Sequence, residues 1–229
     1  MTHKNPIQII YEDEALIIVN KRSGMLSVPD GAVKANDLVS ILNQQIEREK
    51  VQAKALPCHR LDKETSGVMV FAKGRKAQQI VMDQFRQRKI KKTYIAFVHG
   101  RFKQVKGVMK SNMQGAWPYR KNEGNKMAIT NFELINSASN FSILRIAPIT
   151  GRTNQIRIQF RDCGHPLIGE RRFTHARDWP IKFKRVALHA YSVEINHPLT
   201  NKRIDFSVPI PDDMLGFMQE HNIANVFSW

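Results

Sequence analysis

Apolar positions along the chain follow two periods, one typical of strands and one typical of helices. Residues 7–20 predict two short strands around an acidic turn, and the β-branched and aromatic run 68–72 predicts a buried strand. Apolar residues three and four apart predict helices over 36–50 and 75–88. The remaining predicted elements are strands at 92–100, 128–136, 141–149, 191–196 and 203–208, a helix over 150–161 and a short helix from about Asp212.

One long stretch between these elements, residues 101–126, is poor in apolar residues and rich in Lys, Asn and Gly. It therefore predicts a loop. Trp117 and Arg120 lie in its middle, where an aromatic side chain among basic residues could stack on unpaired bases or could form a packed turn. The composition leaves both interpretations open.

The size of the chain, 229 residues, fits one large domain or two closely packed lobes. No apolar run approaches the roughly 20 residues of a membrane span, and the N-terminus has no apolar signal core. The two cysteines, Cys58 and Cys163, form no C-x-x-C pattern, which argues for a reducing compartment and against a structural metal. We expect a cytoplasmic protein without a membrane partner.

The net charge of +16, from 36 Lys and Arg against 20 Asp and Glu, predicts a polyanionic partner. No long basic amphipathic helix with an aromatic face is visible, so nucleic acid is favoured over an acidic membrane surface. Basic side chains are dense from 73 to 92, where they could form a solvated face or an edge that contacts phosphates.

The segment with the most chemistry is His59-Arg60-Leu61-Asp62-Lys63-Glu64-Thr65-Ser66-Gly67, directly before the buried strand 68–72. A loop held at the end of a rigid strand is a good place for catalysis. An Asp there can be partly dehydrated and still be kept ionised by a nearby Arg. A simple charged turn, with Asp62 as a cap and Arg60 in solvent, is the alternative.

This segment resembles the catalytic motif of the RluA-type family of RNA pseudouridine synthases. The resemblance continues over roughly 7–211, through Lys91-Lys92-Thr93-Tyr94, through Thr150-Gly151-Arg152-Thr153-Asn154-Gln155-Ile156-Arg157, and through Gly164-His165-Pro166-Leu167-Ile168-Gly169-Glu170. It implies one catalytic domain over 1–229 without an N-terminal RNA-binding module. The implied fold is α+β, with a mixed, largely antiparallel sheet flanked by helices and an active cleft across the sheet. The sequence also predicts more strands than helices, which supports the α+β class independently of the resemblance.

The resemblance also implies roles for individual residues. Asp62 would be the catalytic carboxylate, acting either as a covalent nucleophile or as a base at the ribose 2′ carbon. Arg157 would pair with it, Tyr94 would stack on the target uracil, and Arg60 would fill the gap left by the flipped base. The family pattern has His where this chain has Asn154 and Gln159, and Asp where it has Glu170. The other residues expected to bind RNA are His59, Thr65, Arg152, Gln155, Trp117 and Arg120, although a structural role is the alternative for His59.

Two functions remain in view on the sequence. The first is an RNA pseudouridine synthase that acts as a monomer, without cofactor or metal, on a stem-loop of large-subunit rRNA, of tRNA or of both. The second is a non-catalytic basic RNA-binding protein that keeps the fold. The retained Asp62, Tyr94 and Arg157 favour the enzyme. A metal-dependent nuclease is disfavoured, because the eight His residues show no ligand spacing.

Overall fold

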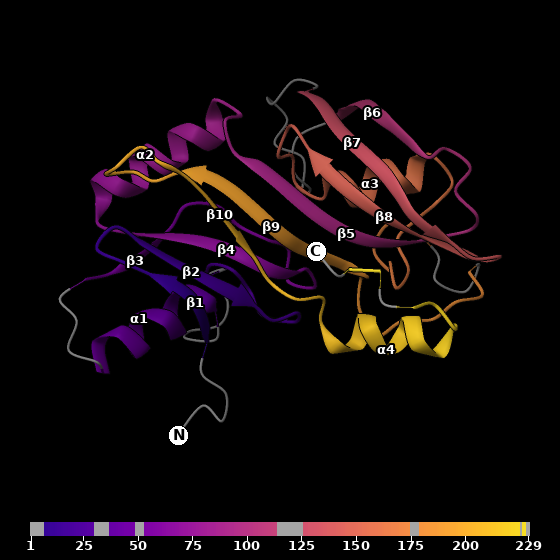
Figure 1. Cartoon of the computed structure of the whole chain (residues 1–229), viewed down its shortest axis with the longest axis horizontal. Helices are drawn as coiled ribbons and strands as arrows, with labels where there is room; N and C mark the ends of the chain where they lie inside the picture. Colours follow the sequence, from indigo (N-terminus) through magenta and orange to yellow (C-terminus); the bar gives the residue numbers. More distant parts are fainter. Residues whose placement is uncertain are drawn as a thin grey trace. The chain divides into compact units, whose positions relative to one another are not determined.

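A computed structural model describes residues 7–29, 37–48, 53–113, 126–174, 179–224 and 226–227. The chain divides into two compact units, which are described separately below (Figure 1). Unit 1 is formed by Met1–Lys91 and Ala190–Val208, and unit 2 by Lys92–His189 and Pro209–Trp229. The elements are β1 (Gln8–Glu12), β2 (Leu16–Lys21), α1 (Leu38–Arg48), β3 (Ala55–Pro57), β4 (Ser66–Lys73), α2 (Arg75–Arg86), β5 (Lys91–His99), β6 (Lys106–Met113), β7 (Lys126–Ser137), β8 (Phe141–Pro148), α3 (Gln155–Asp162), β9 (Leu188–Asn196), β10 (Arg203–Ser207) and α4 (Asp212–Glu220).

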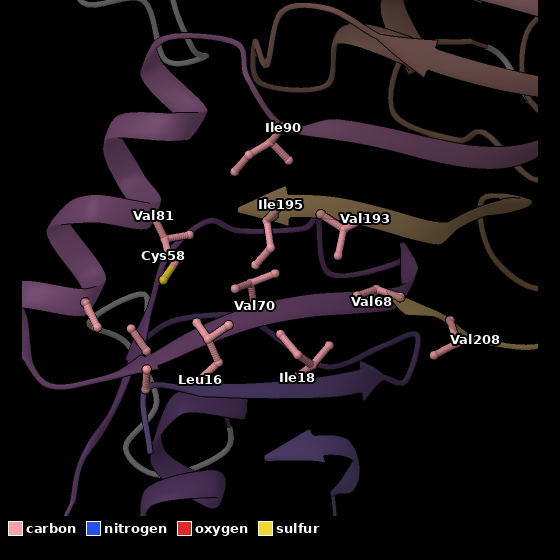
Figure 2. Close-up of a cluster of buried hydrophobic side chains, with 13 residues drawn as sticks. Leu16, Ile18, Cys58, Val68, Val70, Val81, Ile90, Val193, Ile195 and Val208 are labelled. Atoms are coloured by element: carbon pink, nitrogen blue, oxygen red, sulfur yellow. The ribbon is translucent and has the colours of Figure 1, made fainter. Parts of the chain in front are cut away.

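The strands of unit 1 follow the order β1-β2-β4-β9, with β3 beside β4 and β10 beside β9. Successive side chains of a strand point to opposite faces of its sheet. Leu16 and Ile18 of β2 and Val68 and Val70 of β4 therefore share one face, where they pack against Val81 of α2 (Figure 2). Both faces of β4 are buried, as its continuous apolar run predicts.

Helix α1 is attached to β3 by a side-chain amide that forms two hydrogen bonds with the strand backbone. The amide of Asn43 donates to the carbonyl of Ala55 at 3.0 Å and accepts from the backbone N–H of the same residue at 2.8 Å. The apolar face of the helix, Leu38, Leu42 and Ile46, is buried. Both contacts fix α1 beside the short strand β3.

The strands of unit 2 follow the order β5-β8-β7-β6. Ala96 of β5 lies in a buried cluster with Ile156 and Phe160 of α3. Its neighbour Phe97 packs its ring against Phe217 of α4, with 5.5 Å between the ring centroids. Because adjacent strand residues point to opposite faces, α3 and α4 cover opposite faces of this sheet.

The predicted α+β class, with a mixed but largely antiparallel sheet and flanking helices, is confirmed. The prediction of a loop over 101–126 is wrong for 106–113, because β6 runs from Lys106 to Met113 and pairs with β7, and residues 114–125 lie outside the described part of the chain. This strand alternates between exposed and half-buried positions and carries Gly107, whose partner Phe132 lies over it. The helix predicted over 150–161 begins only at Gln155. Trp117 and Arg120 lie outside the described residues.

Candidate active site

The Asp62 turn, residues 59–65, leads into β4 as the sequence predicts. Asp62 is partly exposed, and its carbonyl accepts the N–H of Thr65 at 3.1 Å, so the chain reverses tightly around it. Arg60 is exposed, whereas Thr65 is buried. The ring of His59 accepts the N–H of Val70 through Nε2 at 3.0 Å, which ties the start of the turn to the strand that follows it.

A buried lysine holds the Asp62 turn from the end of β2. Lys21 has no exposed surface, and its ammonium donates to the carbonyls of Arg22, Met25 and Lys63 at 3.0, 2.7 and 3.2 Å. A buried charge requires such partners, because leaving the ammonium without them costs several kcal/mol. Lys21 thereby links the loop after β2 to the residue that follows Asp62.

The loop after β2 makes further hydrogen bonds to the same turn. Ser23 donates its hydroxyl to the carbonyl of Glu64 at 2.7 Å, and the N–H of Gly24 donates to that of Lys63 at 2.8 Å. The hydroxyl of Ser27 donates to the carbonyl of Leu61 at 2.7 Å and accepts the N–H of the same residue at 3.0 Å. The backbone on both sides of Asp62 is therefore fixed by a segment about 40 residues earlier.

Gly67, which closes the sequence motif, can only be glycine for two independent reasons. Its φ of +116° is a conformation that residues with a Cβ rarely adopt. A Cβ at this position would also lie 2.1 Å from the carbonyl oxygen of Ala190, a backbone atom of the neighbouring strand β9. Glycine at this position therefore lets the backbone at the start of β4 approach β9 closely.

Tyr94 lies on β5 in unit 2, opposite Ile146 of β8. It is half-buried and packs against the apolar cluster beneath α3. Two residues earlier on the strand, Lys92 donates to the carbonyl of Thr150 at 3.4 Å, and burial lowers the pKa of its amine to about 8. β5 thus contacts the start of the turn that precedes α3.

The turn before α3 is ordered by the buried amide of Gln155. Its oxygen accepts the hydroxyl of Thr150 at 2.7 Å and the N–H of Arg152 at 2.9 Å. Its nitrogen donates to the hydroxyl of Thr130 at 2.8 Å and to the carbonyl of Ile129 at 3.1 Å. Gln155 therefore fixes the backbone of Arg152, the neighbouring residue that was also predicted to bind RNA.

Gln159, at one position where the family pattern has His, belongs to the same buried network. Its oxygen accepts the hydroxyl of Thr130 at 2.6 Å, and its nitrogen donates to the hydroxyl of Ser111 at 3.1 Å and to the carbonyl of Ala128 at 3.2 Å. This amide links α3 to β6 and β7. A neutral amide can make all of these contacts at once, because it is both donor and acceptor.

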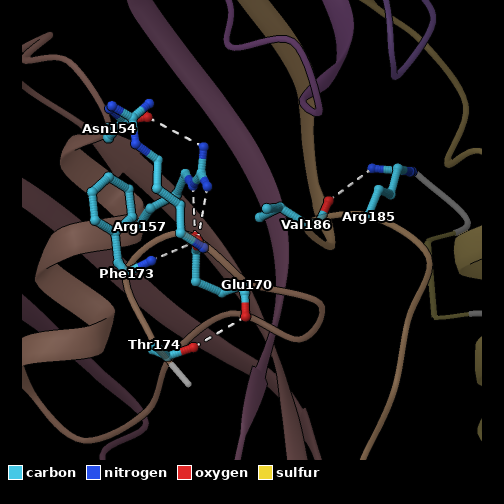
Figure 3. Close-up of polar contacts among 8 residues, drawn as sticks. Asn154, Arg157, Glu170, Phe173, Thr174, Arg185 and Val186 are labelled. Carbon is cyan, nitrogen blue, oxygen red and sulfur yellow. Dashed lines mark hydrogen bonds and ion pairs between the residues drawn. The ribbon is translucent and has the colours of Figure 1, made fainter. Parts of the chain in front are cut away.

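The guanidinium of Arg157 is buried, and several groups surround it (Figure 3). Its Nε and one terminal nitrogen donate to the two carboxylate oxygens of Glu170 at 2.6 and 2.8 Å, and its other terminal nitrogen donates to Oδ1 of Asn154 at 3.2 Å. The ring of Phe173 lies 5.0 Å from the guanidinium carbon, within the range of a cation–π contact. Burial alone would raise the pKa of Glu170, but hydrogen bonds from Arg157 bring it below its usual value.

The structure thus groups the predicted site residues in two sets, one in each unit. The sequence pointed to Glu170 by one signal only, its position at the acidic end of the segment 164–170, and the structure pairs it with Arg157. Within the described residues, no three His, Cys, Asp or Glu side chains gather as metal ligands would. In the same part of the chain, no helix has the length and apolarity needed to cross a membrane. Unit 1 carries His59, Arg60, Asp62 and Thr65, whereas unit 2 carries Tyr94, Arg152, Gln155 and Arg157.

Comparison with known proteins identifies the class to which this fold and this set of residues belong. Residues 15–162 match the family model described as RNA pseudouridylate synthase. The chain is similar to the dual-specificity RNA pseudouridine synthase RluA of Escherichia coli, at 34% identity over 91% of the chain and 98% of that protein. It is also similar to the ribosomal large subunit pseudouridine synthase D of Blochmanniella floridana, at 30% identity over 92% of the chain and 71% of that protein.

A solved structure shows the same fold. Human RNA Pseudouridylate Synthase Domain Containing 4 matches with a TM-score of 0.76 and 22% identity, over 94% of this chain and 93% of that one. The chain belongs to the RNA pseudouridylate synthase family. It is an isomerase that modifies RNA, as the resemblance of its motifs to RluA-type enzymes predicts.

Proposed function

We propose that Asp62 is the carboxylate on which the isomerisation depends, that Arg157 is its partner, and that Tyr94 stacks on the uracil. The reaction breaks the bond from ribose C1′ to uracil N1, forms a bond from C1′ to C5, releases the C5 hydrogen as a proton, and leaves N1 to take up a proton, so that the product is an isomer of the substrate. An ionised carboxylate is needed whether it acts as a nucleophile or as a base at the ribose 2′ carbon. The observation that carries the assignment is the fixed Asp62 turn, in which hydrogen bonds from Lys21 and Ser27 hold the backbone on both sides.

We propose that the target uridine is flipped out of its helix or stacked loop before it reacts. Extrusion of a base costs a few kcal/mol, which contacts in the site must supply. Stacking on an aromatic ring contributes about 1–3 kcal/mol per base, and Tyr94 is the proposed ring. Arg60, which is exposed on the Asp62 turn, is the proposed residue for the vacated position. Lys and Arg side chains would bind the phosphates, so affinity should fall as salt rises.

The proposed substrate is a stem-loop of large-subunit rRNA, of tRNA or of both. The names of the relatives support this choice, because one is called dual-specificity and another acts on the large ribosomal subunit. Pseudouridine mapping in cells with and without this chain would identify the target. If cells without this chain lack one pseudouridine in rRNA and one in tRNA, dual specificity is supported. If they lack a pseudouridine in rRNA alone, the substrate is limited to the ribosome.

We propose further that the protein acts in the cytoplasm as a monomer. Cys58 and Cys163 are free thiols, as expected in a reducing compartment. The net charge of +16 opposes self-association through like-charge repulsion. A fluorescent fusion would test the location, and sedimentation equilibrium would test the mass in solution.

The experiment that tests the catalytic assignment is Asp62→Asn, assayed by tritium release from C5 of labelled uracil in RNA. We expect product formation to be lost while RNA binding stays within a few-fold, because the replacement keeps the shape of the turn. Asp205→Asn is the matched control, since this aspartate is exposed on β10 in the same unit. An Asp62→Asn variant with full activity on a verified substrate would refute the assignment.

A further inference from the structure

The guanidinium of Arg157 contacts Glu170, Asn154 and Phe173, and each of these side chains constrains it in a different way. The two carboxylate oxygens of Glu170 accept from Nε and one terminal nitrogen along one edge of the guanidinium. Asn154 accepts from the other terminal nitrogen, and the ring of Phe173 lies in cation–π range of the group. A two-point grip on one edge fixes the plane of the group, because a planar guanidinium cannot rotate without breaking both hydrogen bonds. The contact from Asn154 constrains the opposite terminal nitrogen.

Glu170 is itself held by donors other than Arg157. Its Oε1 accepts the backbone N–H groups of Arg172 at 2.8 Å and Phe173 at 3.2 Å. The carboxylate would therefore stay in place if the guanidinium moved, so its position is set by the backbone. This makes Glu170 a fixed support, against which the orientation of Arg157 is defined.

Asn154 is fixed by its backbone conformation. Its φ of +55° is left-handed, a region that Asn adopts more readily than most residues with a side chain, and it immediately precedes α3. The side chain therefore leaves the turn in a set direction, toward a residue one helical turn later. Asn154 and Glu170 are also two positions at which this chain departs from the resembled family pattern, and both contact the same guanidinium.

We propose that Glu170 and Asn154 are positioning residues of the isomerase, which act only by orienting the guanidinium of Arg157. The proposal rests on the proposed role of Arg157 in catalysis. Neither residue needs to touch the uridine or the RNA. Their loss should therefore slow the chemical step while leaving RNA affinity nearly unchanged, and the effect should require an arginine at 157.

The test compares Glu170→Gln and Asn154→Gly with the wild type, using single-turnover rates of pseudouridine formation and filter binding of the same RNA. We expect a rate loss of about 100-fold for Glu170→Gln and about 5-fold for Asn154→Gly, with dissociation constants within 3-fold. Glycine adopts φ of +55° freely, so Asn154→Gly removes the acceptor without straining the turn. Because Asn154 is only partly buried, that arm remains informative if Glu170→Gln fails to fold.

Two control variants are matched to these changes within unit 2. Asp213→Asn removes the carboxylate from the pair with the buried Arg185, whose hydrogen bonds of 2.6 and 2.8 Å repeat the two-point geometry. Asn222→Gly replaces an exposed asparagine with the same φ of +55°. Both controls should keep their rates within 2-fold. A control that loses as much rate as its counterpart would show a general structural effect and overturn the proposal.

The decisive step repeats both variants in an Arg157→Met background, followed over hours to resolve slow rates. If the two residues act through Arg157, each should now change the rate by less than 2-fold, because mutations that share one route are not additive. An undiminished loss in that background would overturn the proposal. If Arg157→Met itself keeps the full wild-type rate, the proposed role of Arg157 fails instead, which separates the two hypotheses.

Discussion

Replacing Lys21 with Met tests whether one buried ammonium holds the Asp62 turn in place. Lys21 is fully buried and donates to the carbonyls of Arg22, Met25 and Lys63. Methionine is similar in length and fills the same space, so the change removes the donor without opening a large cavity. The expected effect is therefore almost wholly that of the lost hydrogen bonds.

The magnitude follows from the three acceptors. A hydrogen bond from a charged donor contributes about 1.5–3 kcal/mol, which gives roughly 5–9 kcal/mol for the three, although the carbonyl of Lys63 keeps the N–H of Gly24 as a donor. Relief of the desolvation of the ammonium offsets several kcal/mol of this cost. We therefore expect Lys21→Met to lower the free energy of unfolding by about 3 kcal/mol. The single-turnover rate should fall too, because the backbone around Asp62 loses a support.

Urea denaturation at constant pH measures this change through the midpoint and the slope. Lys91→Met is the matched control in unit 1, because Lys91 is exposed and its ammonium forms an ion pair with Glu194 at 3.3 Å. Such a pair contributes about 0–1 kcal/mol, so the control should stay close to the wild type. A Lys21→Met protein within 1 kcal/mol of the wild type, at an unchanged slope, would refute the reasoning.

Two further predictions concern backbone approach and protonation. Gly67→Ala should lower the free energy of unfolding in urea by about 3–5 kcal/mol, because the new Cβ would lie 2.1 Å from the carbonyl oxygen of Ala190. Gly74→Ala is the control: its φ of +89° is also strained for alanine, but the space around it is open, so the loss should be only about 1–2 kcal/mol. Equal losses for the two variants would exclude the steric explanation. Burial, with a smaller effect of Lys182, lowers the pKa of His99 to about 4. As the pH falls below 6.5, the unfolded chain therefore binds a proton at this histidine before the folded chain does. The free energy of unfolding should drop by about 2 kcal/mol by pH 5. Thermal melts across this range should show a shallower slope for His99→Phe, and an unchanged slope would show that another group is responsible.

Much of the fold could be predicted because the patterns that signal it are local. The run 68–72 is apolar at every position, and β4 is buried on both faces. The alternation after Lys91 and the spacing from Arg75 likewise gave β5 and α2. β6 was missed because it lies at the end of the strand order, beside β7 only, so its sequence shows no continuous apolar run.

The sequence by itself determined the motif residues, the class of reaction through their resemblance, and most of the helices and strands. Only the tertiary structure decided which groups support those residues, such as Lys21 beneath the Asp62 turn and Glu170 on Arg157. The physical reason is that periodicity reports which face of an element is buried, a property of neighbours along the chain. The partner of a buried charge depends instead on which distant segment the folded chain brings within hydrogen-bonding distance, and no local pattern encodes that.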